Sequence, residues 1–134
     1  MADQATLKSF IVLFVIYVLV DAFWQLVLSL PLWESQVRRL TGREMTIGRW
    51  STLFTNALIV LGLNYLAFTL INSGRLVQDS VLYGLIFGLT VFGSFNFNNV
   101  ATLPGYNIAL GLVDTFWGVL VSVISLYFAG AFLL

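Results

Sequence analysis

Four long apolar segments dominate this chain and limit what it can fold into. They cover approximately residues 9–30, 48–71, 80–98 and 106–128. Each can cross a hydrocarbon layer about 30 Å thick, which takes about 20 helical residues. Backbone groups in lipid find no water, so these unbroken runs predict helices that satisfy their own hydrogen bonds. We predict an all-α integral membrane protein, in which residues 1–134 form a single transmembrane domain with a four-helix bundle.

The composition excludes several classes of function. With 60% hydrophobic and 9% charged residues, the chain has too little polar surface for a water-soluble globule. Its formal net charge is zero, so we expect no nucleic-acid partner. It contains neither histidine nor cysteine, which removes the usual zinc and haem ligands and the commonest general base. We therefore predict no metal centre and no cofactor, and the sequence does not predict an enzyme.

The first connection, residues 31–47, is the one sizeable polar insert. Trp33, Val37 and Leu40 recur in it at helical spacing and Gly42 follows, which predicts a short amphipathic helix on the membrane surface. An ordinary solvated loop would explain its charges equally well. The expected interfacial lipid contacts are Trp33, Arg38, Arg39, Arg43 and Trp50. The other two connections are short turns, which makes successive helices antiparallel neighbours.

The basic residues predict an orientation. We call the side of the membrane that carries the N-terminus side A, and the side of the first connection side B. Four of the six basic residues belong to side B. The positive-inside rule then puts side B in the cytoplasm and both termini on the other side.

The first and fourth segments share an internal echo. Residues 19–24 read LVDAFW and residues 112–117 read LVDTFW, identical at five of six positions. The two segments run in opposite directions, so the echo has inverted topology, as do the repeats of many transporters.

Several polar side chains fall at one depth in the side B half of the membrane. At about 1.5 Å rise per residue, their distances from the segment centres place them on a common shelf. An aspartate at a helix centre costs about 2.5–3.5 kcal/mol on insertion, so we expect both aspartates to face the bundle interior. The predicted cluster is Asp21, Asn56, Asn96, Asn98, Asn99 and Asp114, supported by Trp24, Trp117, Asn64 and Tyr65.

Three interpretations of the aspartate pair are open. Hydrogen-bonded aspartates can join helices, each contact contributing about 1 kcal/mol. Two carboxyl groups that share a proton can instead form a proton or cation site. Catalysis is the least favoured, because the Gly-x-Gly-Asp context of intramembrane aspartyl proteases is absent. Gly84 and Gly88 form a Gly-x-x-x-Gly pattern that favours close helix packing within the chain over packing against another chain.

Four motifs resemble a known family of membrane proteins. They are residues 21–24 (DAFW), 83–88 (YGLIFG), 99–103 (NVATL) and 113–118 (VDTFWG). The chain resembles domain of unknown function 2177 (DUF2177) over nearly its whole length. The resemblance implies a four-helix membrane fold and no established activity. Where we expect family members to carry an acidic residue, three positions before Asn99, this chain has Asn96.

The sequence leaves three roles open. The first is a structural or accessory role in a larger membrane assembly. The second is a channel or transporter for a small solute, a proton or an ion, built on the Asp/Asn cluster and forming a homo-oligomer. The third is binding or modification of membrane lipids, with the arginine-rich connection attracting anionic headgroups.

Overall fold

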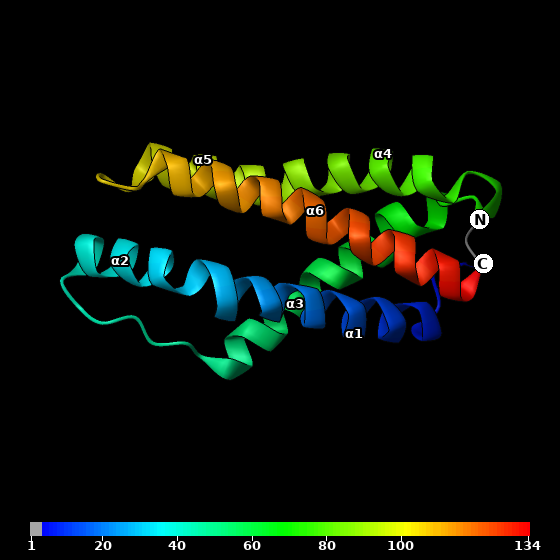
Figure 1. Ribbon diagram of the computed structural model, residues 1–134, viewed down its shortest axis with the longest axis horizontal. Helices are drawn as coiled ribbons and strands as arrows, with labels where there is room; N and C mark the ends of the chain where they lie inside the picture. Colours follow the sequence, from blue (N-terminus) through cyan, green and yellow to red (C-terminus); the bar gives the residue numbers. More distant parts are fainter. Residues whose placement is uncertain (1–3) are drawn as a thin grey trace.

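The computed structural model describes residues 4–134 and contains four long helices, which confirms the predicted all-α membrane architecture (Figure 1). The helices span Leu7–Thr41, Arg49–Leu70, Ser73–Thr102 and Ile108–Leu133, with 35, 22, 30 and 26 residues. All four are long and apolar enough to cross a bilayer. Both ends of the chain lie at the same end of the molecule, at the right of Figure 1, so successive helices are antiparallel.

Three of the four helices are composite. The first consists of α1 (Leu7–Phe23), the π-helical turn η2 (Trp24–Ser29) and α2 (Leu30–Thr41). The second consists of α3 (Arg49–Gly62), the π-helical η3 (Leu63–Ala67) and the 3₁₀ turn η4 (Phe68–Leu70). The third consists of the 3₁₀ turn η5 (Ser73–Arg75), α4 (Leu76–Gly88), the π-helical η6 (Leu89–Gly93) and α5 (Ser94–Thr102). The fourth, α6 (Ile108–Leu133), is a single α-helix that contacts α1, α4, α5 and η6.

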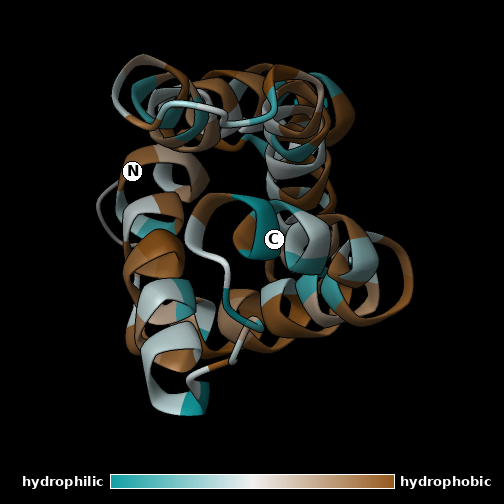
Figure 2. Cartoon of the chain, turned by 90° about the vertical axis from the view of Figure 1, so that its left-hand side faces the viewer, coloured by the Kyte–Doolittle hydropathy of each residue, from teal (hydrophilic) through white to brown (hydrophobic). Residues whose placement is uncertain are grey.

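The bundle has an apolar outside, which suits lipid as its solvent, and an interior that combines a hydrophobic core with buried polar side chains. Seen from the side B end, all the helices carry stretches of brown, the colour of hydrophobic residues, with white and teal stretches between them (Figure 2). Large hydrophobic side chains are exposed along all four helices. The buried polar side chains include Ser9, Asp21, Ser29, Asn56, Asn64, Asn96, Asp114, Ser122 and Ser125.

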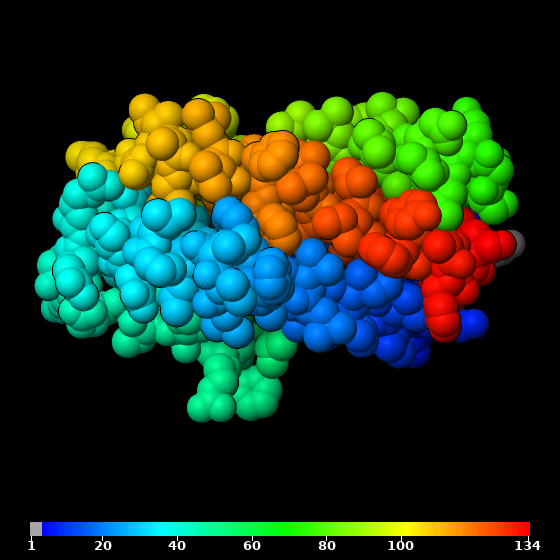
Figure 3. Space-filling model, in the orientation of Figure 1, coloured from blue at the N-terminus to red at the C-terminus, as the bar shows by residue number. Residues whose placement is uncertain are grey.

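The first helix extends beyond its predicted end. We expected it to stop near Leu30 and a separate amphipathic helix to follow, but α2 continues the first helix to Thr41 without a break. Pro31 is tolerated because it lies in the first turn of α2, directly after the π-helical turn η2. Gly42 then ends the helix in the left-handed conformation, at φ 68°. In Figure 3 the segment coloured as α2 packs against the yellow segment that precedes α6.

Two glycines bring α4 and α6 into backbone contact. A Cβ atom on Gly84 would lie 2.8 Å from the backbone nitrogen of Val123, and one on Gly88 would lie 2.5 Å from the Cα atom of Val119. The Gly-x-x-x-Gly pattern therefore serves packing within this chain. Because α6 also contacts α1 and α5, this close contact fixes the position of the central helix.

We predict that Gly88→Ala destabilises the bundle and Gly93→Ala does not. The added methyl group at Gly88 meets the backbone of α6, and such overpacking costs about 1–3 kcal/mol. At Gly93 the nearest atom is a Thr115 methyl at 3.6 Å, an ordinary contact. The measurement is the free energy of unfolding in mixed micelles. Equal stability of the two variants would show that the α4–α6 contact is looser than described.

Candidate functional site

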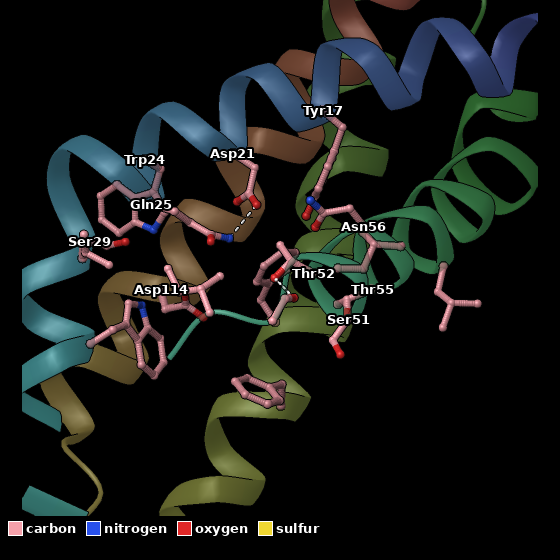
Figure 4. Close-up of a pocket in the computed structure, with 18 of the residues that line it drawn as sticks. Tyr17, Asp21, Trp24, Gln25, Ser29, Ser51, Thr52, Thr55, Asn56 and Asp114 are labelled. Carbon is pink, nitrogen blue, oxygen red and sulfur yellow. Dashed lines mark hydrogen bonds between the residues drawn. The ribbon is translucent and has the colours of Figure 1, made fainter. Parts of the chain in front are cut away.

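A cavity of about 680 Å³ lies toward side B of the bundle (Figure 4). Its walls come from the end of α1, from η2 and the start of α2, from α3, from η6 and the start of α5, and from α6, and residues 45–48 of the first connection cover part of it. The polar side chains that line it are Tyr17, Asp21, Gln25, Ser29, Thr46, Ser51, Thr52, Thr55, Asn56 and Asp114. The aromatic ones are Trp24, Trp33, Phe92 and Phe95.

Asp21 is held by donors on two helices. Gln25 Nε2 donates to Asp21 Oδ2 at 2.7 Å, and Trp117 Nε1 donates to Asp21 Oδ1 at 3.3 Å. Gln25 follows Asp21 by four residues, a spacing that places the two side chains on the same helix face. Both carboxylate oxygens of Asp21 therefore already accept a hydrogen bond, one of them from α6.

Asp114 ends a short chain of hydrogen bonds. The Tyr106 hydroxyl donates to Asn96 Oδ1 at 2.7 Å, and Asn96 Nδ2 donates to Asp114 Oδ2 at 2.7 Å. Burial raises the pKa of Tyr106, in the connection between α5 and α6, so its hydroxyl keeps the proton that it donates. Asp114 Oδ1 has no hydrogen bond among the described residues, and Asp114 lines the cavity.

The internal echo brings α1, η2 and α6 together at one point. The rings of Trp24 and Trp117 stack with their centroids 4.8 Å apart and their planes at 11°. Their indole nitrogens differ, because Trp117 donates to Asp21 whereas Trp24 Nε1 is buried without a partner in the described part of the chain. No hydrogen bond between residues 4–134 joins the two carboxyl groups directly.

Further polar atoms at the cavity lack partners within the described residues. The side chains of Tyr17 and Asn56 point toward one another in Figure 4, but neither makes a hydrogen bond to a described residue. The hydroxyl of Ser29, on η2, is fully buried and unpaired. The cavity thus offers unused donors and acceptors on α1, η2, α3 and α6.

Four of the predicted residues neither line the cavity nor bond to its carboxyl groups. Asn98 is exposed, because two residues correspond to about 200° of rotation around the helix from the buried Asn96. Asn64 lies at the side A end, where it accepts a 2.7 Å hydrogen bond from Ser9 Oγ and joins η3 to α1. Tyr65, its neighbour, is 54% exposed. Asn99 is half-buried and does not line the cavity.

The predicted interfacial residues lie at or near the side B end. Trp33 lines the cavity and packs against Tyr106 with ring centroids 6.5 Å apart, so it has a role inside the bundle as well. Trp50 is 85% exposed at the start of α3. Arg38 pairs with Glu44 at 2.8 Å, Arg39 bonds to Gln36, and Arg43 is exposed. Their contact with lipid stays a prediction.

The predicted cluster left out several polar residues of this region, including Gln25, Ser29 and Tyr106. Gln25 had a signal, since Gln and Asp four residues apart on a helix commonly bond. Ser29 had a weaker one, because it matches Ser122 when the echo is extended, but its burial at the cavity depends on the π-helical turn η2. Tyr106 had none, because its role depends on how α5 meets α6.

Comparison with known proteins gives one match. The family model described as "Predicted membrane protein (DUF2177)" matches residues 6–131. No curated protein and no solved structure matches the chain.

We predict that Asn96→Ala lowers the free energy of unfolding by about 2 kcal/mol, because it removes the donor to Asp114 and the acceptor of Tyr106. Asn98→Ala is the control, since this exposed residue on the same helix should change stability by no more than about 0.5 kcal/mol. Unfolding in mixed micelles measures both. An unchanged stability of Asn96→Ala would mean that the hydrogen-bond chain contributes nothing.

The two tryptophans of the echo should respond differently to the same change. Trp117→Phe loses the hydrogen bond to Asp21, whereas Trp24→Phe removes a nitrogen that has no partner among the described residues. Since both variants keep a stacked ring, we expect Trp117→Phe to be less stable by about 1–2 kcal/mol. The same unfolding measurement applies, and a larger loss in Trp24→Phe would contradict the assignment.

Proposed function

The chain belongs to the DUF2177 family of predicted membrane proteins, and we propose that it binds a small cation in the side B cavity and passes it across the membrane. The observation that carries this proposal is the charge of the cavity wall. Asp21 and Asp114 both line the cavity, and no lysine or arginine among the described residues does so. A carboxylate in an apolar bundle needs a compensating positive charge, which a proton or a bound cation supplies.

The free polar atoms support a ligand at this position. Buried polar groups are hydrogen-bonded in nearly all proteins, and an exception calls for an explanation. Five buried side-chain atoms lack a partner among the described residues, and two of them, Trp24 Nε1 and Ser29 Oγ, belong to residues that line the cavity, whereas Gln36, Ser80 and Ser125 do not line it. Asp114 Oδ1 and the side chains of Asn56 and Tyr17 also line the cavity without a hydrogen bond to a described residue. A cationic ligand with its water would pair with these groups.

The local helix geometry also supports a binding site. The π-helical turns η2 and η6 supply walls of the cavity through Trp24, Ser29 and Phe92 among others. Such turns are rare inside α-helices and frequent at functional sites. They keep the helices continuous while they turn side chains out of α-helical register.

Passage would require a second conformation. Leu13, Val60 and Leu63, each with no exposed surface, pack on the side A side of the cavity. An apolar plug of this kind stops a charged solute. The described state therefore corresponds to a site that is closed toward side A, and side chains of α1, α3 and η3 would have to separate for release.

The structural or accessory role and the lipid-binding role stay predictions. The sequence favoured a structural or accessory role in a membrane assembly, and it left lipid binding and a homo-oligomer open. The carboxylate-lined cavity is what makes the transport alternative the better supported one, because packing alone needs no such space.

The test is proton and cation flux into proteoliposomes. We expect Asp21→Asn and Asp114→Asn each to lower flux about tenfold or more, which corresponds to about 1.4 kcal/mol of lost interaction. The matched control is Asp79→Asn, because Asp79 is an equally buried aspartate at the side A end, where it accepts a hydrogen bond from the Asn72 backbone. Absence of flux in the unmodified protein, at full folding yield, would contradict the proposal.

A further inference from the structure

We infer that the cation is organic, a substituted ammonium ion with an apolar body that lies between Asp114 and the aromatic wall of the cavity. This inference rests on the proposed function, since it names the class of solute for the same site. Four features of the cavity carry it: its size, its aromatic wall, its one free carboxylate oxygen and its charge.

The size of the cavity suits an organic molecule. One water in the liquid occupies about 30 Å³, so a cavity of about 680 Å³ is far larger than an inorganic ion with a few waters requires. Sites for drug-sized molecules measure about 300–1,000 Å³. A proton relay needs a file of waters, for which this space is equally excessive.

The wall of the cavity suits an apolar body with a positive charge. Rings of Trp24, Trp33, Phe92 and Phe95 line it, together with Leu30, Leu58 and Ile59. Aromatic faces attract ammonium groups, by about 2 kcal/mol or more when water is excluded. The stack of Trp24 on Trp117 holds the Trp24 ring in place, so this part of the wall is rigid before a ligand binds.

The free acceptors suit an ammonium group better than a metal ion. Both oxygens of Asp21 already accept hydrogen bonds from Gln25 and Trp117, which leaves Asp114 Oδ1 as the carboxylate oxygen without a described donor. Hard metal ions require about six or more oxygen ligands at short distance. One carboxylate oxygen and nearby rings are sufficient for a substituted ammonium ion.

The charge of the wall disfavours other organic solutes. An anion would meet two carboxyl groups and no basic side chain among the lining residues. A neutral solute brings no positive charge, so the carboxyl groups would have to hold protons instead. A cation with an apolar body satisfies both parts of the wall at once.

The test is calorimetric titration of the full chain in nanodiscs with benzyltrimethylammonium, with sodium chloride and with benzenesulfonate. We expect saturable binding of the ammonium ion alone. Asp114→Asn should weaken it at least tenfold, and Thr55→Trp should abolish it by filling the cavity that Thr55 lines. Thr90→Trp is the matched control, because Thr90 is exposed on η6 and does not line the cavity. Thr55→Trp removes no buried polar group, so it keeps the test valid if Asp114→Asn fails to fold.

The outcomes separate this inference from the proposed function. Flux of protons or sodium without ammonium binding would overturn the inference that the cation is organic and would leave the proposed function standing. Ammonium binding without flux of any cation would support the ligand class and overturn passage. Equal binding by the unmodified protein and Thr55→Trp would place the ligand outside the cavity and overturn the inference. Neither binding nor flux would overturn both.

Discussion

A carboxyl group inside a lipid bilayer finds only the partners that its own bundle supplies, and the interior of this protein is arranged around that constraint. Asp21 draws its donors from η2 and α6, and Asp114 draws its donor from α5. Each aspartate thus joins segments that are distant in sequence. Direct backbone contact at Gly84 and Gly88 also holds α6 against α4. Asp114, which lies on α6, can therefore face the cavity while that contact keeps the helix in place.

The sequence predicted the parts of this arrangement that depend on hydropathy and small residues. Apolar runs of sufficient length predicted four antiparallel spans, and Gly84 and Gly88 predicted close packing within the chain. The sequence could not predict that the first helix continues to Thr41, because Pro31 normally marks a boundary, and here it follows directly after a π-helical turn that the sequence did not reveal. A shift from α to π geometry depends on tertiary packing, which has no simple sequence signal.

The candidate site also has features that the sequence predicts and features that only tertiary packing decides. Depth alone placed Asn96 and Asn98 together, but depth carries no information on helix face, and the rotation of about 200° between them separates a buried donor from an exposed amide. The depth of a residue in the membrane also could not reveal the cavity, because the cavity depends on how α3 is placed relative to α1, η6 and α6. Gln25 was predictable from its spacing to Asp21, whereas Tyr106 depended on the meeting of α5 and α6.

The echo between the first and last helices connects stability with function. Two tryptophans of inverted helices meet in a stack, yet Trp117 has a carboxylate partner whereas Trp24 Nε1 and Asp114 Oδ1 have no partner among residues 4–134. A fully symmetric pairing would satisfy both indoles and leave no acceptor for a ligand. The asymmetry keeps one aspartate committed to the bundle and the other free at the cavity wall. Under the proposed function Asp114 would bind the cation, while Asp21 joins η2 to α6 and adds its charge to the cavity wall, so the repeated motif need not serve one role in both of its copies.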